Sequence, residues 1–338
     1  MQRFALLGAG FIGTVHAANL ASNPDIDFAL VYDVDLERAA AVARAHGASV
    51  AASIDHAFDP ARIDAVLIAS STNTHAENLR RAADAGIAAF VEKPVDLDLA
   101  TVRETVAHVQ RAGIPAMVDF NRRFDRDHAE LRRIVQSGAV GEVELVQLTS
   151  RGPASPPLEY VEVSGGQMRD QTVHFFDLAR WICGEDPVEV YVAGAALADP
   201  RIARYGDVDT SIATLRLPSG GLIQIDSVRR TGYGYDERIE VMGSTGLVES
   251  GRHRAGHVVR YAGTAIEVDG LHDGWFERVR PTYAAALTAF VSAIEQGTPP
   301  PVTLDDGLKA EAIVDAATVS LRSGRPEPIE YRSDGAGR

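Results

Sequence analysis

Apolar and polar residues follow two alternating patterns along the first 121 residues. Short apolar runs bounded by turn residues are typical of strands buried on both faces, and apolar residues three and four apart are typical of helices. Strands that alternate with helices favour parallel pairing through crossover connections. The pattern therefore predicts a doubly wound parallel sheet over residues 1–121. The predicted strands are RFALL, DFALVYD, DAVLIAS, AAFVEK and PAMVDF, and the helices between them are TVHAANLAS, AVARAHG, HAENLRRAADAG and LATVRETVAHVQRAG.

The pattern changes after residue 121. A charged helix, DRDHAELRRIVQSG, is followed by a proline-rich loop, GPASPP, and by several strands with few helices between them. Strands in succession favour an antiparallel sheet, and the SG between two of them is typical of a hairpin. We therefore predict a second α/β domain over residues 122–338 with a mostly antiparallel, open sheet. Its strands are VELVQLTSR, VEVYVAGA, TSIATLRLP, GLIQIDSVRR and ERIEVMG, and its closing helices are FERVRPTYAAALTAFVSAIEQG and DGLKAEAIVDAATVSLRSG.

Composition and charge limit the partners of this chain. The 338 residues are 46% hydrophobic and 24% charged, as in soluble globular proteins. A formal net charge of −14 repels a nucleic-acid backbone and an anionic membrane. No apolar run approaches the roughly 20 residues of a membrane span, and the N-terminus lacks a signal-peptide pattern. The single cysteine, Cys183, forms no internal disulfide. We therefore expect a cytoplasmic protein with no nucleic-acid or membrane partner.

A glycine motif follows the first strand and predicts a dinucleotide site. Gly8, Gly10 and Gly13 form GxGxxG, and Asp33 ends the second strand about 20 residues later, as in dinucleotide-binding folds. We expect the three glycines, with Phe11 and Ile12 between them, to hold the cofactor. The glycines allow a tight turn and let the backbone and the helix N-terminus approach a pyrophosphate. A carboxylate at Asp33 binds ribose hydroxyls and repels a 2′-phosphate, which favours NAD over NADP. The alternative is a tight turn without a ligand.

Polar residues also follow the next two strands, in SSTNTH and EKP. Ligands of doubly wound sheets bind beyond the carboxyl ends of the strands. We therefore expect this edge of the sheet to contact the nicotinamide and the substrate. The residues concerned are Ser70, Asn73, His75, Glu92 and Lys93.

Asp170 and His174 stand four residues apart in RDQTVHFFDLARW, which otherwise has the pattern of a buried helix. Residues four apart on a helix are neighbours, so a carboxylate there can bond one ring nitrogen and leave the other for proton transfer. This arrangement orients a general base. The alternative is a core histidine bonded to a nearby acid.

Several longer motifs resemble one known family over nearly the whole chain. GAGFIG, VEKPV, FNRRFD, GGQMRDQTVHFFDLARW, GYGYDERIEVMGSTG and WFERVRPTYAAALTAF are similar, in this order, to motifs of the glucose–fructose oxidoreductase, inositol dehydrogenase and rhizopine catabolism (Gfo/Idh/MocA) superfamily, and most of all to its inositol 2-dehydrogenases. The resemblance implies an N-terminal Rossmann domain, a C-terminal α/β domain, and a homotetramer formed through the open sheet. It also implies that the peptide before Pro94 is often cis.

The resemblance further implies roles for single residues. Lys93, Asp170 and His174 would form the catalytic group, in which His174 is the base, Asp170 orients it, and Lys93 stabilises charge on the reacting oxygen. The same three residues and Asn121, Arg122 and Tyr233 would bind substrate.

Each of these assignments has an alternative. Lys93 could be a surface lysine and Tyr233 a turn aromatic, and of the adjacent Arg122 and Arg123 at most one should reach the pocket while the other pairs with an acid. We expect no metal site, because no cysteine pair or His/carboxylate cluster at ligand spacing accompanies Asp170 and His174.

The expected activity is NAD-dependent oxidation of myo-inositol at C2 to 2-keto-myo-inositol. Alternatives are a dehydrogenase of another cyclic polyol or pyranose, such as scyllo-inositol, chiro-inositol or an aldose, and a non-catalytic NAD-binding sensor. Phe175, Asn73 and Asp119 stand where many inositol dehydrogenases differ, with an acid expected at position 175, and this leaves the preferred isomer open.

Overall fold

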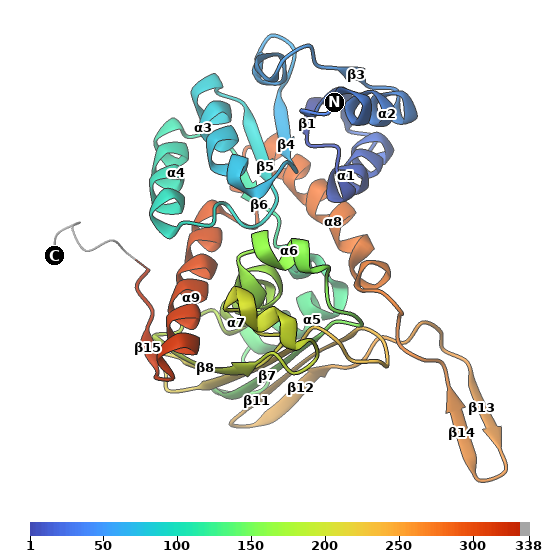
Figure 1. Ribbon diagram of the computed structural model, residues 1–338, viewed down its shortest axis with the longest axis vertical. Helices are drawn as coiled ribbons and strands as arrows, with labels where there is room; N and C mark the ends of the chain where they lie inside the picture. The colour runs from blue at the N-terminus through green and yellow to red at the C-terminus, as the bar shows by residue number, and fades with distance from the viewer. Residues whose placement is uncertain (332–338) are drawn as a thin grey trace. The chain divides into compact units, whose positions relative to one another are not determined.

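The structure, a computed structural model, describes residues 1–331 (Figure 1). The chain forms two compact units. The first comprises Met1–Asn121 and Thr282–Leu308, and the second comprises Arg122–Pro281 and the chain from Lys309 onward. The two continuous domains expected from the sequence, 1–121 and 122–338, stay a prediction. The compact units differ from them in that 282–308 belongs to the same unit as the N-terminal residues.

A six-stranded, all-parallel sheet forms the centre of the first unit, in the order β3-β2-β1-β4-β5-β6. Every residue of β4 and β5 is buried, as expected for parallel strands covered on both faces. The predicted doubly wound sheet is therefore confirmed. The strands are β1 (Gln2–Leu7), β2 (Ile26–Tyr32), β3 (Ser49–Val50), β4 (Ala65–Ile68), β5 (Ala88–Val91) and β6 (Ala116–Val118).

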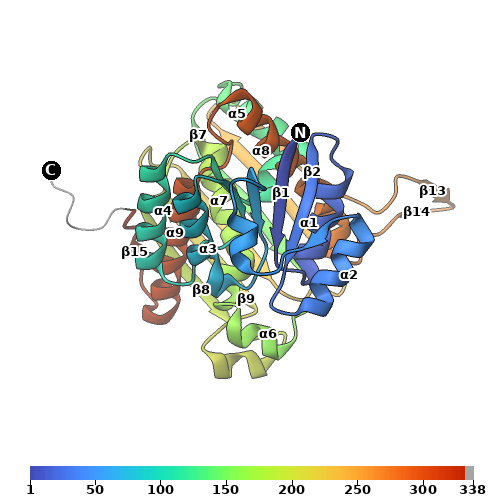
Figure 2. The same cartoon turned by 90° about the horizontal axis from the view of Figure 1, so that it is seen from above.

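Four helices connect these strands, and local signals set where they begin and end (Figure 2). The side chains of Asp35 and Asp98 cap α2 and α4 by accepting hydrogen bonds from first-turn backbone N–H groups. Gly47, Gly86 and Gly113 end α2, α3 and α4 in the left-handed conformation. The helices are α1 (Phe11–Ser22), α2 (Leu36–His46), α3 (His75–Ala85) and α4 (Leu99–Ala112).

A late segment of the chain completes the first unit. The ring of Phe290, in helix α8 (Trp275–Gln296), lies 6.4 Å from that of Phe4 and 5.5 Å from that of Phe90, both on the central sheet. Met117 of β6 also forms an isolated bridge with Thr303. The first unit therefore buries its core with residues from both ends of the chain.

A seven-stranded sheet forms the second unit, in the order β12-β11-β7-β10-β9-β8-β15. Its pairs are antiparallel, as predicted, except for β10 with β7. β9 and β10 form the expected hairpin. The strands are β7 (Val143–Arg151), β8 (Glu189–Ala195), β9 (Thr210–Arg216), β10 (Leu222–Val228), β11 (Asp236–Gly243), β12 (Gly246–Ser250) and β15 (Glu327–Pro328).

The two faces of this sheet differ. Helices α5, α7 and α9 cover one face, on which alternate residues such as Ile223 and Ile225 are buried (Figure 1). The other face leaves an apolar row across β10, β11 and β12, where Leu222, Met242 and Leu247 are exposed. The helices are α5 (Arg126–Gln136), α6 (Leu158–Val163), α7 (Val173–Cys183) and α9 (Leu304–Ser323).

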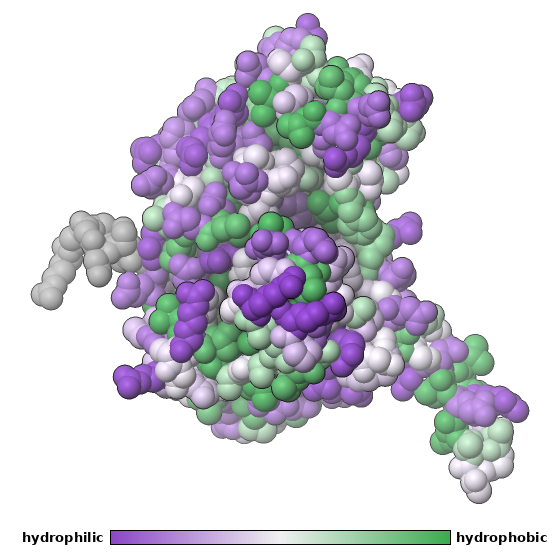
Figure 3. All heavy atoms as spheres, viewed as in Figure 1, coloured by the Kyte–Doolittle hydropathy of each residue, from purple (hydrophilic) through white to green (hydrophobic). Residues whose placement is uncertain are grey.

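The second unit also carries a hairpin and a helix that the sequence pattern did not predict. β13 (Val259–Ala262) and β14 (Ala265–Val268) form a separate two-stranded sheet, and their exposed apolar side chains include Ile266 and Val268. Hydrophobic residues of this hairpin appear green at the lower right of Figure 3. The segment predicted as a proline-rich loop leads directly into α6. None of the helices within residues 1–331 has the length and apolar character required to cross a membrane.

Candidate functional site

The glycine turn after β1 admits no larger residue at two of its positions. Gly8 has a φ of 98°, and a Cβ there would lie 2.4 Å from the carbonyl oxygen of Ala69. A Cβ on Gly13 would lie 2.1 Å from the carbonyl oxygen of Gly8. Close packing of α1 on the turn therefore depends on both glycines, as the motif predicts.

The same turn fits a dinucleotide. A Cβ on Gly10 would meet nothing within 4 Å, so the backbone there faces open space. Gly10 precedes α1 without a side-chain cap, which leaves the helix N-terminus able to receive an anion. Phe11, whose side chain is exposed, and the half-buried Ile12 form the first turn of this helix. Backbone and space at the turn suit the pyrophosphate of NAD.

Asp33 follows β2 and holds the turn from the other side. Its Oδ2 accepts a hydrogen bond from the backbone N–H of Ala9 at 2.7 Å, and its Oδ1 accepts one from Asp35 at 2.8 Å. Each carboxylate oxygen has a second lone pair, so both remain able to accept from ribose hydroxyls. The sequence did not reveal this second task of Asp33, which is to fix the glycine turn.

The loops after β4 and β5 are joined by His75. The ring is buried, with Nδ1 2.8 Å from the carbonyl oxygen of Pro94 and Nε2 3.0 Å from that of Ser70. Asn73 is exposed in the short turn between these contacts. The Lys93–Pro94 peptide is cis, as the resemblance implies. His75 thus braces the loop that carries Lys93, and its contact with a cofactor stays a prediction.

Glu92, expected at the cofactor, is buried in a cluster with His16 and Asp119. Its Oε1 lies 2.8 Å from Nε2 of His16, and its Oε2 accepts a hydrogen bond from the backbone N–H of Lys93 at 3.2 Å. Oδ2 of Asp119 lies 3.7 Å from the same histidine nitrogen. Burial alone raises the pKa of Glu92, but the hydrogen bond and charge of His16, with smaller contributions from Lys93 and His75, hold it below its usual value.

The expectation that the chain has no metal site stays a prediction. Potential metal-ligating atoms of His16, Glu92 and Asp119 all lie within 4.8 Å of one another, although no ligand spacing connects these residues along the chain. The three come from α1 and from the ends of β5 and β6, so only the fold brings them together. Nε2 of His16 and Oε1 of Glu92 are hydrogen-bonded to each other, so these potential ligand atoms are already partners without a metal ion.

In the second unit, Asp170 lies on a π-helical turn, Met168–Thr172, and His174 on the α-helix that follows it. The sequence predicted a regular helix through both residues, and this was wrong at Asp170. Tyr160 donates a hydrogen bond to Oδ1 of Asp170 at 2.7 Å, and Arg229 donates one to Oδ2 at 3.1 Å. These two residues were missed because their separations from Asp170, 10 and 59 residues, follow no recognisable spacing. They orient the carboxylate and neutralise part of its charge.

The residues expected to bind substrate are engaged inside their own units. Asn121 donates to Oγ1 of Thr282 at 2.9 Å, and Tyr233 donates to Asp236 at 3.0 Å. Arg122 donates to Glu237 at 3.2 Å; burial raises the pKa of Glu237, but the charges of Arg122, His128 and Arg278 together outweigh burial and hold this pKa below its usual value. These contacts leave the substrate role of all three as a prediction.

Arg123 also pairs with a buried acid. It donates to both carboxylate oxygens of Asp177, at 2.7 and 2.5 Å. The sequence predicted an acid partner for one of the two adjacent arginines, and the structure provides one for each.

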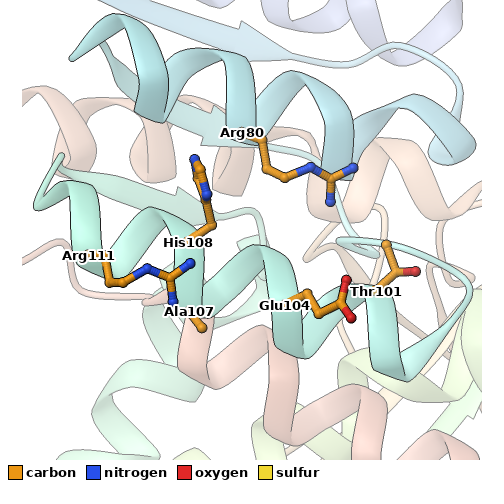
Figure 4. Close-up of a pocket in the computed structure, with 6 residues that line it drawn as sticks. All are labelled: Arg80, Thr101, Glu104, Ala107, His108 and Arg111. Carbon is orange, nitrogen blue, oxygen red and sulfur yellow. The ribbon is translucent and has the colours of Figure 1, made fainter.

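A surface groove of the first unit lies elsewhere (Figure 4). It runs between α3 and α4, and none of the residues expected in the site lines it. Charges of both signs face the groove, so it does not resemble a site for one charged ligand. Its lining residues are Arg80, Thr101, Glu104, Ala107, His108 and Arg111.

Comparison with known families and proteins covers both units. Residues 2–120 match the family described as "Oxidoreductase family, NAD-binding Rossmann fold", and residues 128–249 match the "GFO/IDH/MocA C-terminal domain". An inositol 2-dehydrogenase from Rhizobium meliloti is 42% identical over 96% of this chain and 98% of its own length. An NAD⁺-dependent scyllo-inositol 2-dehydrogenase from Bacillus subtilis is 32% identical over 98% of this chain and 97% of its own length. The crystal structure of a myo-inositol dehydrogenase from Corynebacterium glutamicum is 36% identical, covers 98% of this chain and 99% of its own, and has a TM-score of 0.92.

Proposed function

This chain belongs to the Gfo/Idh/MocA oxidoreductase family, and from that premise we propose that it oxidises myo-inositol at C2 to 2-keto-myo-inositol with NAD as hydride acceptor. The observation that carries the proposal is similarity over nearly the whole chain to an inositol 2-dehydrogenase. The glycine turn with open space at Gly10 and the braced Asp170 beside His174 support it chemically.

The first unit would hold NAD through its backbone. Bound NAD supplies the hydride acceptor. The N-terminus of α1 and the turn at Gly8 and Gly10 would receive the pyrophosphate, and Asp33 would accept from the ribose hydroxyls. Negative charge on Asp33 disfavours the 2′-phosphate of NADP. The loop residues Ser70, Asn73 and His75 would line the nicotinamide side.

Oxidation of a secondary alcohol requires removal of the hydroxyl proton as the hydride leaves the same carbon. We assign proton removal to His174 and its orientation to Asp170, which Tyr160 and Arg229 hold in turn. Lys93 would donate a hydrogen bond to the reacting oxygen and stabilise the negative charge that develops there. Asn121, Arg122 and Tyr233 are the proposed hydrogen-bonding partners of the other ring hydroxyls.

The second candidate is oxidation of scyllo-inositol, which the similarity to the Bacillus subtilis enzyme favours. The two substrates differ in the configuration of one hydroxyl, so a small change of the pocket suffices to exchange them. Phe175, one of the residues that raised this alternative, is buried in α7 and 1% exposed. An effect of Phe175 on the isomer would therefore act through packing beneath His174.

We further propose a homotetramer in the cytoplasm that assembles through the open sheet face. The apolar row formed by Leu222, Met242 and Leu247 supports this, because exposed apolar patches mark interaction surfaces. Sedimentation of the wild type and of Leu247→Glu tests it. A tetramer that the substitution dissociates is the expected result. A reducing compartment suits the single thiol of Cys183.

A substrate panel tests the proposed reaction. NADH absorbance would give kcat/KM for myo-, scyllo- and chiro-inositol, glucose and an acyclic alcohol, and NMR would identify the oxidised carbon. We expect myo-inositol to be preferred and C2 to be oxidised. Preference for scyllo-inositol would support the second candidate, preference for an acyclic alcohol would overturn the substrate class, and tight NAD binding without turnover would indicate a sensor.

Lys93→Met tests the catalytic assignment. Loss of the ammonium should lower kcat by about a thousandfold and leave the Kd of NAD within about threefold, since Lys93 is assigned to the reacting oxygen. Lys309→Met, which removes a lysine paired with Asp186 in the second unit, is the matched control and should keep near-wild-type turnover. A Lys93→Met enzyme with most of its kcat would remove Lys93 from the chemistry.

A further inference from the structure

His16 occupies an unusual position in the first unit. It lies on α1, three residues after the last glycine of the turn, and its side chain is fully buried. The ring packs edge-to-face against two aromatic rings. Its centroid lies 5.8 Å from that of Phe90 in β5 and 5.5 Å from that of Tyr283 in α8. An apolar residue would satisfy this packing. A histidine is required only if its nitrogen does something that packing does not.

The nitrogen Nε2 faces two buried carboxylates. Oε1 of Glu92 lies at 2.8 Å and Oδ2 of Asp119 at 3.7 Å. Both acids are less than 10% exposed. Burying a carboxylate is costly unless it is paired and hydrogen-bonded, so a donor at this position decides whether Glu92 stays in place.

The carboxylate of Glu92 also contacts the backbone of Lys93. While Oε1 meets His16, Oε2 accepts the hydrogen bond from the backbone N–H of Lys93 at 3.2 Å. Both oxygens of one rigid carboxylate are therefore used, and the rotamer of Glu92 fixes the backbone from which the Lys93 side chain starts. An unbroken series of contacts runs from α1, through His16 and Glu92, to Lys93.

We propose that His16 is a positioning residue for Lys93, acting through the carboxylate of Glu92. The proposal rests on the proposed function in that it takes Lys93 as catalytic. His16 touches neither substrate nor cofactor in this role. It ties the helix that begins at the glycine turn to the loop that presents Lys93, so that the cofactor-binding turn and the catalytic lysine of the first unit keep one geometry.

Four variants separate this role from a packing role. His16→Leu fills the space and removes the donor, whereas His16→Gln keeps an N–H that can reach Glu92. His108→Gln removes a surface histidine of the same unit that pairs with Asp84, and it serves as the matched control. Glu92→Gln breaks the series from its other end should His16→Leu fail to fold.

Two measurements read out the position of Lys93. Amide hydrogen exchange of the peptide that contains Lys93 should accelerate at least tenfold in His16→Leu, because its N–H loses Glu92, and much less in His16→Gln. Turnover of inositol deuterated at C2 should show kcat lowered about tenfold or more in His16→Leu, with a larger primary isotope effect and a Kd for NAD within about twofold. His16→Gln should recover most of the loss, and His108→Gln should match the wild type.

A double mutant separates the proposal from the proposed function. In a Lys93→Met background, His16→Leu should lower the residual rate by less than twofold, because His16 acts through a group that is already gone. Independent, multiplied losses would overturn the positioning role, as would unchanged exchange at Lys93 in both His16→Leu and Glu92→Gln. If Lys93→Met alone retains turnover, the catalytic assignment fails instead. Amide hydrogen exchange at Lys93 in the His16 variants would still test whether His16 holds the Lys93 loop through Glu92.

Discussion

The two units use different parts of the polypeptide to make their functional surfaces. In the first, the proposed cofactor site is formed mainly by backbone. Gly8 and Gly13 allow the tight turn, the backbone at Gly10 faces open space, and Asp33 accepts hydrogen bonds from backbone N–H groups of the turn and of Asp35. In the second, two of the proposed site residues, Arg122 and Asp170, belong to ion pairs, and further buried pairs of charged side chains lie in the same unit. These pairs are Arg122–Glu237, Arg123–Asp177, Arg229–Asp170, Arg229–Asp207 and Arg278–Asp125.

This difference has a physical reason. A diphosphate is common to every dinucleotide, and repeated backbone N–H groups at a helix N-terminus suit it in any sequence. A polyol offers hydroxyl groups whose directions differ between isomers, so side chains must be held in fixed rotamers. A buried charge is held firmly by an opposite charge, because removing one partner leaves the other uncompensated. The first unit should therefore be sensitive to backbone changes, and the second to loss of single charges.

The largest effect should come from the proposed base and its partner. Asp170→Asn and His174→Gln should each lower kcat, with His174→Gln costing about a thousandfold, because a positioned base contributes 10²–10⁴-fold. The double mutant should be little worse than the worse single mutant, since the two groups act as a unit. Steady-state kinetics with NAD binding as control measures this. Losses that multiply would show two separate roles.

Backbone sensitivity of the first unit is tested at Gly8. Gly8→Ala should lower the free energy of unfolding by about 3 kcal/mol, because a left-handed conformation is added to a clash with the carbonyl of Ala69. Gly47→Ala is the matched control, since Gly47 is also left-handed (φ 76°) but has open space around it. It should cost only about 1 kcal/mol. Urea denaturation gives the free energy of unfolding of both variants. Equal losses would show that the backbone conformation alone, and not the clash with Ala69, destabilises Gly8→Ala.

A smaller effect is expected for cofactor choice. Asp33→Ala should lower kcat/KM for NAD about tenfold and raise the ratio of NADP to NAD use, because the charge that repels a 2′-phosphate is gone. Asp35→Ala controls for the nearby carboxylate, which caps α2, and should reduce stability without changing the preference. Equal use of both cofactors by the wild type would contradict the assignment of Asp33.

The smallest effect concerns acid stability in the second unit. Burial raises the pKa of Asp125, but His128 and Arg278 outweigh this and hold it well below its usual value. A lowered pKa stabilises the fold above about pH 4 and loses that contribution as pH falls toward the folded-state value. Asp125→Asn should therefore cost about 1 kcal/mol more at neutral pH than at pH 3. Asp199→Asn, at a half-buried carboxyl whose pKa is lowered by its hydrogen bonds with the exposed Arg201, should change stability much less. Denaturation across pH measures both.

Sequence reasoning succeeded where a function imposes a local pattern. Gly8, Gly13 and Asp33 stand at fixed spacings that the fold requires, and most strands of both sheets have short apolar or alternating patterns; β3, β12 and β15 were not predicted. It did not find Arg229 and Tyr160 beside Asp170, because side-chain pairing between distant segments leaves no periodic signal. The π-helical turn at Asp170 was missed because five residues are too few to distinguish its period from that of an α-helix. The hairpin β13–β14 was missed because its apolar positions alternate over only four residues per strand.

The late segment that completes the first unit has a consequence for synthesis on the ribosome. Phe290 packs against Phe4 and Phe90, so the core that supports the glycine turn lacks one of its aromatic rings until the chain has been made past residue 290. At about 5–20 residues per second, the N-terminal strands wait roughly 10–40 s for this partner. During that interval all of the contiguous part of the second unit, 122–281, is synthesised. The first unit thus completes its core only after most of the second unit has been translated, and nascent chains arrested before α8 should expose an incomplete nucleotide fold.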